Sequence, residues 1–359
     1  MKILVIYATA GAGHRKAAEA ISKGFVLSSH QVHYVDALDY TSRFYKHIYT
    51  QTYTFLISRI PWLWGLLFRL LDIPALLPLV RSLRRIQNAI HAGPLARFLV
   101  REQFDCIFST HFFPCEVASY LKRQGRISSR LICTVTDYDV HSIWVSRGVD
   151  YYTVATDWTK RKMQHLGVPD SLIAVTGIPT DEKFSQHKNL GALRTRLGLQ
   201  PGETTVLIAT GSFGIGPIEE IINQLNGFQL VVVCGHNKSL YQKLSQQKKT
   251  LVKVCGLVDN MDELMAASDV MVTKPGGLSI SEALVTGLPL VFFNAIPGQE
   301  TNNIKVLETY GIGRLCVTVD QIAQTLRGFK NDPQALSAAK SRVQLLARPG
   351  AVKDIIKLL

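Results

Sequence analysis

Two groups of residues in this chain have types and spacings suited to chemistry. The first is AGAGHRK at 10–16, where His14 stands in a Gly-rich turn beside Gly13. An imidazole held in such a turn can take a proton from a ligand hydroxyl at neutral pH. The second is TKPGGLSISEALVTGLPLVFFNAIPGQETNN at 273–303, which joins two Gly-containing turns to carboxylate and amide side chains. Backbone N–H groups at a helix start there can bind an anion such as a diphosphate.

The turn at 10–16 does not match the two common nucleotide-binding patterns. A dinucleotide fingerprint needs a third glycine where Lys16 stands, and the phosphate-loop pattern GxxxxGK[ST] is absent. His14 therefore has two interpretations at this point. It is either a proton acceptor at a ligand site or a residue that only hydrogen-bonds the turn.

The polar residues of the run at 273–303 are equally open to two interpretations. Ser279 and Glu282 have the S-x-x-E spacing of a capping box, in which the glutamate only binds the helix start. A carboxylate near that helix start can instead accept hydrogen bonds from both hydroxyls of a ribose. Gln299 and Glu300 offer an amide and a carboxylate to sugar hydroxyls, although surface loop residues would have the same pattern.

Further loops of the second half follow predicted strands. In ATGSFGIGPIEEI at 209–221, glycines separate a strand from a helix, so that backbone N–H groups can receive a diphosphate. An ordinary tight turn is the alternative. The predicted contacts of this turn are Gly211, Ser212, Gly214 and Gly216. Asn237 in VCGHN and Val258 in GLVDNM close two more strands and are expected to border a nucleotide base.

The loop TDYDVHSIW at 136–144 follows a predicted strand of the first half. The spacing of Asp137 and Asp139 can hold a divalent metal, although neighbouring acids are also frequent by chance. We favour the other interpretation, in which Asp137, His141 and Trp144 shape the pocket of an acceptor substrate or orient His14. His111, at the end of another predicted strand, is open to the same interpretations.

The elements that must position these residues are two alternations of strands and helices, which predict an α/β fold. The strands of the first are KILVIY, FDCIFST, RLICTVT and YYTVAT, and those of the second are TTVLIAT, QLVVVCG, VKVCG, DVMVT and LPLVFF. Such arrays form Rossmann-like domains that bind ligands at the carboxyl ends of their strands. We expect two of them facing a central cleft, at 1–182 and 204–332. A linker is predicted at 183–203, and a helical segment at 333–359 is expected to pack back on the first domain.

The amino-acid composition is that of a globular protein with reduced cysteines. The chain has 359 residues, 47% of them apolar and 19% charged, which excludes a disordered chain and suits two domains. Its six cysteines are scattered without a CxxC pair, which predicts reduced thiols in a cytosolic protein. The first residues lead into the Gly-rich turn rather than a cleavage site, so we expect no signal peptide.

The formal net charge of +13 is concentrated in one segment of the first half. Residues 41–101 hold nine basic residues and one acid, and they include the apolar run IPWLWGLLFRLLDIPALLPLV at 60–80. Prolines and charges within this run argue against a membrane span, whereas tryptophans with flanking arginines suit the interface of an anionic bilayer. The residues expected at that surface are Trp62, Trp64, Arg69, Arg81, Arg84 and Arg85. A buried helical hairpin is the alternative, and no nucleic-acid recognition motif accompanies the charge.

Together, these motifs resemble those of a known family. GAGHRKAAEAI, TVTDYDVHSIWVS, VTGIPT, VVVCGHN and TKPGGLSISEAL…IPGQETNN look like the monogalactosyldiacylglycerol synthase and processive diacylglycerol glucosyltransferase group, in the right order over residues 1–310. The resemblance implies a GT-B fold. It also implies inverting transfer of a hexose from UDP-galactose or UDP-glucose to the sn-3 hydroxyl of diacylglycerol, without a metal. The enzyme would be a peripheral protein on the cytoplasmic side of an anionic membrane.

The resemblance also implies a role for each candidate residue. His14 would be the base, and Gly13, His111, Asp137 and His141 would lie on the acceptor side. Glu282 would bind the ribose, Gln299 and Glu300 the sugar, and the Ser212–Gly216 turn the diphosphate. Lys274 would stabilise the departing diphosphate, and the other donor-side residues of its run are Gly276, Gly277 and Ser279.

Three other functions are compatible with such a fold. A UDP-sugar 2-epimerase would have no need for the basic apolar segment. An N-acetylglucosaminyl transferase acting on an undecaprenyl lipid normally has GGHxxP where this chain reads GAGHRKA. A non-catalytic lipid or nucleotide sensor would lack transfer and hydrolysis of a UDP-sugar.

Overall fold

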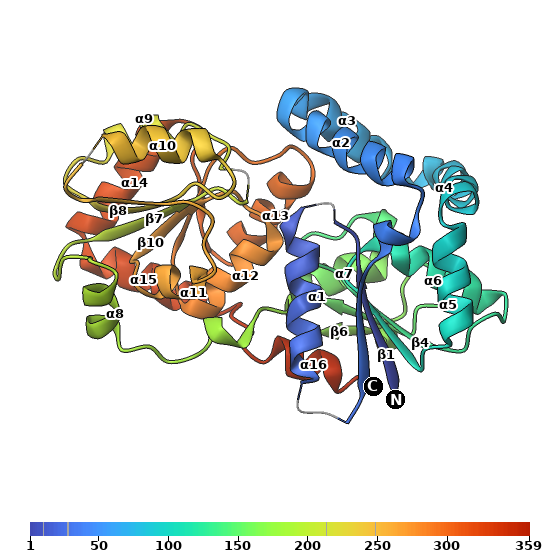
Figure 1. Ribbon diagram of the computed structural model, residues 1–359. Coiled ribbons are helices and arrows are strands. Elements are labelled where there is room, and N and C mark those ends of the chain that lie inside the picture. Colours follow the sequence, from blue (N-terminus) through green and yellow to red (C-terminus); the bar gives the residue numbers. More distant parts are fainter. Residues whose placement is uncertain (10, 27–28, 213, 248) are drawn as a thin grey trace. The chain divides into compact units, whose positions relative to one another are not determined.

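The computed structural model describes residues 1–9, 11–26, 29–212, 214–247 and 249–359 and divides into two compact units. Unit 1 contains residues 1–181, 296–302 and 350–359, and unit 2 contains residues 182–295 and 303–349. Each unit has one six-stranded sheet, and all the pairs between neighbouring strands are parallel (Figure 1). The predicted α/β class is confirmed.

The sheet of unit 1 has the strand order β2-β1-β3-β4-β5-β6. Its strands are β1 (Lys2–Tyr7), β2 (Gln31–Asp36), β3 (Cys106–Ser109), β4 (Arg130–Thr134), β5 (Tyr151–Val154) and β6 (Ile173–Val175). Strands β1 and β3 pair with Ile3 opposite Cys106, and both are buried on both faces, as expected of central parallel strands. His14 lies at the start of the helix after β1, and His111 and Asp137 lie in the loops after β3 and β4. Three candidate residues therefore follow neighbouring strands at one sheet edge.

Helices complete unit 1. They are α1 (Ala12–Gly24), α2 (Arg43–Arg59), α3 (Pro61–Leu70), α4 (Leu77–His91), α5 (Gly93–Glu102), α6 (Phe112–Arg123), α7 (Asp157–His165), the first residues of α13 and α16 (Ala351–Ile356), with short 3-10 helices η1 (Ala37–Tyr40), η2 (Pro74–Leu76), η3 (Ser142–Trp144) and η4 (Asp170–Leu172). Helix α1 buries Ala18 and Ile21 against the sheet, and Ile355 of α16 joins the same core. A Cβ on Gly24 would come within 2.6 Å of Val352 and Ile356, so α1 and α16 pack closely there.

The sheet of unit 2 has the strand order β12-β11-β10-β7-β8-β9. Its strands are β7 (Thr205–Ala209), β8 (Gln229–Val233), β9 (Val252–Cys255), β10 (Val270–Thr273), β11 (Leu290–Phe292) and β12 (Arg314–Leu315). Its helices are η5 (Glu182–Phe184), α8 (Leu190–Arg196), α9 (Ile218–Gln224), α10 (Lys238–Gln246), α11 (Met261–Ala266), α12 (Gly277–Thr286), α14 (Val319–Asn331) and α15 (Pro333–Val343), and α13 (Gln299–Glu308) ends in this unit.

The compact units differ in detail from the ranges expected from the sequence. Residues 183–203 contain helix α8 and belong to unit 2. Residues 333–349 also lie in unit 2, whereas 350–359 lie in unit 1. Residues 296–302, expected in the second domain, are part of unit 1. Gln299 and Glu300 therefore belong to the same unit as His14.

The basic apolar segment at 41–101 forms helices α2 to α5, and α2 and α3 lie side by side (Figure 1). Within the part of the chain that the structure describes, none of the helices combines the length and apolar character needed to cross a bilayer. Exposed apolar side chains are nevertheless frequent on α2, α3 and α4, which is unusual for helices packed on a globular core.

Candidate functional site

His14 lies in the first turn of α1, directly after the Gly-rich turn that follows β1. Its Nδ1 is 2.9 Å from the carbonyl oxygen of Thr110 and 2.8 Å from Oγ1 of Thr136. Because a carbonyl oxygen can only accept, Nδ1 carries the proton and donates it to Thr110. The lone pair of the ring is therefore on Nε2. The structure thus holds His14 in the tautomer that a proton acceptor needs.

The surroundings of His14 keep its ring neutral. The side chain is half-buried, and desolvation lowers the pKa of His14 to about 4, although the hydrogen bond to Thr110 opposes this change. The ring of His111 stands edge-on to it, with centroids 4.6 Å apart. At neutral pH His14 is consequently uncharged and able to accept a proton.

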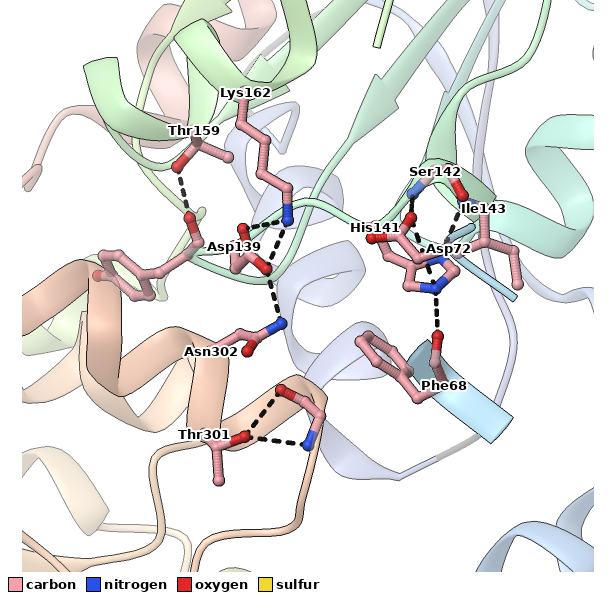
Figure 2. A network of polar contacts seen from close by, with 12 residues as sticks. Phe68, Asp72, Asp139, His141, Ser142, Ile143, Thr159, Lys162, Thr301 and Asn302 are labelled. Atoms are coloured by element: carbon pink, nitrogen blue, oxygen red, sulfur yellow. Dashed lines mark hydrogen bonds and ion pairs between the residues drawn. The ribbon is translucent and has the colours of Figure 1, made fainter. Parts of the chain in front are cut away.

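The two other candidate histidines of unit 1 hold backbone turns in place. Nδ1 of His111 accepts a hydrogen bond from the N–H of Phe113 at 3.1 Å and caps α6. Nδ1 of His141 accepts from the N–H of Ile143 at 3.0 Å, and its Nε2 donates to the carbonyl of Phe68 at 2.9 Å (Figure 2). Burial lowers the pKa of His141 and holds the pKa of His111 well below its ordinary value.

These three histidines predict that unit 1 loses stability in mild acid. Each has a folded-state pKa below the ordinary value of 6.5, so the unfolded chain binds more protons as the pH falls from about 7 to 5. The stabilisation is fully present above the unfolded pKa and is lost as the pH falls towards the folded values. We expect calorimetry to give a lower Tm at pH 5 than at pH 7. His111→Asn, which keeps a capping side chain, is expected to weaken this dependence. Equal Tm values for the wild type at the two pH values would contradict the prediction.

The two carboxylates after β4 are paired with groups of the chain. Both oxygens of Asp139 accept from Nζ of Lys162, at 2.7 and 2.8 Å, and one also accepts from the Asn302 amide at 2.9 Å (Figure 2). Asp137 accepts from Nε2 of Gln299 at 3.0 and 3.1 Å. Among the described residues, no three His, Cys, Asp or Glu side chains are grouped as metal ligands. Asp139 thus forms an ion pair with Lys162 and also accepts a hydrogen bond from the 296–302 segment.

A cavity of about 110 Å³ connects His14 with this loop. Its polar lining comes from His14, His111, Asp137, Asp139, His141 and Gln299, and its apolar lining from Tyr49, Trp64, Phe68, Leu71, Phe112, Ile143 and Trp144. All of these residues belong to unit 1. The cavity therefore places a neutral base beside a largely aromatic wall, which suits an apolar molecule that carries a hydroxyl group.

Helix α3 forms part of the wall of this cavity and is fastened on two sides. A Cβ on Gly65 would lie 2.6 Å from Cβ of Pro297, so the helix packs directly on the 296–302 segment. After the helix ends, a carboxylate oxygen of Asp72 accepts from the N–H of Ser142 at 2.8 Å (Figure 2). Trp64 and Phe68 line the cavity, whereas the side chain of Trp62 is 67% exposed. Apolar side chains thus lie on two faces of α3.

The arginines expected at a membrane surface have different surroundings. Arg84 is mostly buried, with its guanidinium 2.6 Å from Glu116 and 5.4 Å from the ring centre of Phe112. It is therefore a structural residue of α4. Arg69 and Arg85 are exposed, and the side chain of Arg81 lies outside the described residues.

In unit 2, the Gly-rich turn after β7 packs closely on the end of β8. A Cβ on Gly214 would lie 2.3 Å from the carbonyl oxygen of Cys234, and its φ of 56° also favours glycine. The amide of Asn237 donates to the carbonyl of Gly214 at 3.1 Å and its oxygen caps α10. Gly211 and Gly216 are exposed, Ser212 is half-buried, and Phe213 lies outside the described residues. The helix that follows, α9, starts at Ile218.

The capping-box interpretation of Ser279 and Glu282 is wrong. Helix α12 begins at Gly277 with Gly276 as its N-cap, and no side chain caps it. Ser279 is therefore already inside the helix, and Glu282 is half-buried in its second turn.

Three other candidate residues lie near strand ends or helix starts. Lys274 is half-buried and precedes the start of α12 by three residues, and Val258 is half-buried after β9. The carboxylate of Glu300, in unit 1, accepts from the N–H of Ile296 at 2.7 Å.

Sequence reasoning missed several residues of the site. Thr110 and Thr136 orient His14, and each is the last residue of a strand motif that was identified, FDCIFST and RLICTVT. Their place at the strand ends, next to His111 and Asp137, was the available signal. Nothing in the sequence pointed to Lys162 or Asn302 as partners of Asp139.

Comparison with known proteins agrees with the motifs. Residues 14–180 match the model of the monogalactosyldiacylglycerol (MGDG) synthase family, and residues 205–357 match the glycosyltransferase family 28 C-terminal domain. The processive diacylglycerol beta-glucosyltransferase of Staphylococcus carnosus is 34% identical over 70% of this chain and 65% of its own length. That of Bacillus subtilis is 32% identical over 73% of this chain and 71% of its own length. The matches thus span about two thirds of the length of these curated relatives.

A solved structure supports the fold over the whole chain. HepE of Anabaena in complex with UDP-glucose covers 100% of this chain and 99% of its own with a TM-score of 0.60, at 16% sequence identity. Likenesses of this kind confirm the predicted GT-B fold. The two family models follow one another along the sequence, and the agreement with the Bacillus subtilis relative extends over most of both chains. The chain belongs to the family of the monogalactosyldiacylglycerol synthases and processive diacylglycerol beta-glucosyltransferases.

Proposed function

We propose that this protein is an inverting glycosyltransferase that moves a hexose from a UDP-sugar to the sn-3 hydroxyl of 1,2-diacylglycerol. The observation that carries the proposal is the neutral His14, with its lone pair on Nε2, at the wall of a largely aromatic cavity. Diacylglycerol is an apolar molecule with one free hydroxyl, which is the chemistry that such a cavity suits. The names of the Staphylococcus carnosus and Bacillus subtilis relatives support the same acceptor.

In the proposed mechanism His14 is the general base. Nε2 takes the proton of the sn-3 hydroxyl as the oxygen attacks the anomeric carbon from the face opposite UDP. The C–O bond to the diphosphate breaks as the new bond forms, and an α-linked donor gives a β-glycoside. Thr110 and Thr136 hold the ring so that Nε2 remains the acceptor. The proton then resides on the imidazolium until it is released to solvent.

The donor is proposed to bind mainly through unit 2. Backbone N–H groups of the Ser212–Gly216 turn and of the start of α12 would receive the diphosphate, with Lys274 beside them. Glu282 would accept hydrogen bonds from the ribose, and Asn237 and Val258 would border the base. Gln299 and Glu300 are the residues proposed to contact the hexose. The UDP-glucose complex of HepE, a protein of the same fold, supports a UDP-sugar as donor.

The helices α2, α3 and α4 are proposed to dock on the cytoplasmic side of an anionic membrane. More than half of the exposed large apolar residues that the structure describes lie between 44 and 90. On α4 they follow one helical face, at Leu79, Leu83, Ile86 and Ile90. Exposed arginines accompany them, and each cation near an anionic surface contributes about 1 kcal/mol. The charge and the apolar side chains together suit a peripheral membrane protein.

Transfer can be tested with vesicles that contain diacylglycerol and an anionic lipid. The protein is incubated with radiolabelled UDP-glucose or UDP-galactose, and the lipids are separated by chromatography. We expect a labelled β-glycosyl diacylglycerol with at least one donor. A changed UDP-sugar without lipid product, or no glycolipid with either donor, would overturn the proposal.

A further inference from the structure

Two carboxylates of one loop each hold a side-chain amide of the first turn of α13. Asp137 accepts from Gln299, and Asp139 accepts from Asn302, three residues later on the same helix. Both carboxylates are buried, with exposed fractions of 6% and 9%. Asp137, Asp139 and Gln299 line the cavity beside His14, whereas Asn302 does not. Only the Asp137–Gln299 pair therefore combines a buried carboxylate with an amide that faces the cavity.

The chemistry of this pair fixes which end of the Gln299 amide is available. An amide has one end that donates and one that accepts, and on its own it can turn either to a ligand. Nε2 of Gln299 lies 3.0 and 3.1 Å from the two oxygens of Asp137. An ionised carboxylate only accepts, so Nε2 must face Asp137 and Oε1 must point away from it.

We propose that Asp137 is a positioning residue that makes Gln299 present an acceptor, rather than a donor, to a hydroxyl of the bound hexose. The inference rests on the proposed function, since it needs a UDP-hexose as donor. A hexose hydroxyl then donates to Oε1 while Nε2 stays on Asp137. Reversal of the amide would place Oε1 against the carboxylate, where two acceptors face each other without a hydrogen. Asp137 thus determines how Gln299 recognises the sugar without contacting the sugar itself.

The test compares the affinities of UDP-glucose and UDP for the full-length protein, measured by calorimetry. The ratio of these two affinities reports contacts with the hexose and does not depend on proton transfer to His14. We expect Asp137→Leu, which removes the acceptor while keeping a similar shape, to lower this ratio by roughly three- to tenfold, the value of one hydrogen bond. KM for UDP-glucose should rise as this ratio falls, while the affinity for UDP stays unchanged.

A pair of compensating substitutions separates positioning from a general loss of structure. Gln299→Glu places two carboxylates together and is expected to lower the ratio at least as strongly as Asp137→Leu. In the double variant Asp137→Asn with Gln299→Glu, the new amide donates to the new carboxylate, which still offers an acceptor to the sugar. The double variant should therefore recover most of the ratio, and the cycle of variants measures the coupling. Asn302→Ala removes the neighbouring amide–carboxylate contact through a side chain that does not line the cavity, so it is the matched control and should keep the ratio.

The outcomes are distinguishable. Failure of the double variant to improve on Gln299→Glu, or an unchanged ratio in Asp137→Leu, would overturn the inference even if transfer occurs. If Asp137→Leu proves unfolded by calorimetry, rescue of Gln299→Glu by Asp137→Asn decides the question alone. A wild type that binds UDP-glucose no better than UDP and makes no glycolipid would instead remove the proposed function on which the inference rests.

Discussion

Replacement of His14 by alanine lowers glycosyl transfer by roughly 10²–10⁴-fold, the range that general-base catalysis contributes. The reason is that Nε2 of His14 carries the lone pair and lies on the cavity wall. The groups proposed to bind UDP belong to unit 2, so the affinity for UDP should be unchanged. The measurements are initial rates on vesicles that contain diacylglycerol and the Kd of UDP by calorimetry.

His14→Gln is the matched variant for this prediction. The amide can donate to Thr110 in place of Nδ1, so the turn after β1 keeps its hydrogen bond, but an amide at this position is not basic enough to accept the proton. The rate of transfer by His14→Gln should therefore be as low as that of His14→Ala, while the Tm of His14→Gln stays closer to that of the wild type. Because the pKa of His14 is about 4, wild-type turnover should remain level from about pH 8 to 5. Wild-type turnover in either variant would remove His14 from the mechanism.

The second large effect is expected on membrane binding. We predict that the triple variant Trp62→Ser, Leu66→Gln and Leu70→Gln loses roughly 100-fold in affinity for anionic vesicles. The three side chains are 67%, 47% and 40% exposed and recur every four residues on α3. Partial burial in a bilayer interface is worth about 1 kcal/mol for each of them. Vesicle sedimentation measures the affinity directly.

Controls separate docking from damage to the cavity. Transfer to a dispersed short-chain diacylglycerol should persist in the triple variant, since Trp64 and Phe68, on the cavity side of α3, are unchanged. Val317→Ser with Leu345→Gln removes comparable exposed apolar surface from unit 2, where the side chains are 77% and 58% exposed. This control should bind vesicles like the wild type. Wild-type vesicle binding by the triple variant would show that α3 is not part of the docking surface.

The fold was largely predictable because most strands are buried on both faces and appear as continuous apolar runs. The nine strands expected from such runs are all present. Strand β2 was missed because it lies at the sheet edge, where only Asp36 is buried and its polar residues interrupt the pattern. Strands β6 and β12 are only three and two residues long, too short for periodicity to indicate them. Local pattern therefore predicts apolar strands, including the edge strand β9, and fails where an edge strand is polar or very short.

The candidate site was predictable only where chemistry and local sequence coincide. His14 and the loop at 136–144 follow strands directly, so their place at one sheet edge could be inferred. The contact of Gln299 with Asp137 joins residues 162 positions apart, and no local pattern contains it. Ser279 and Glu282 matched a capping box by spacing, but the helix begins earlier, at a glycine pair that needs no side-chain cap. The first feature has no local signal, and in the second the spacing matched while the helix start did not.

The path of the chain has a consequence for how the protein is made. Unit 1 is completed only by residues 350–359, whose Ile355 is fully buried against β1 and α1. The ribosome releases this segment about 170 residues after residue 181, a delay of roughly 10 to 30 s at ordinary rates of synthesis. Unit 2 is continuous except for residues 296–302, so its strands leave the ribosome one after another without a long interruption. The unit that is synthesised first is therefore the last to finish folding, and until then the core face that receives α16 is open to chaperones and proteases.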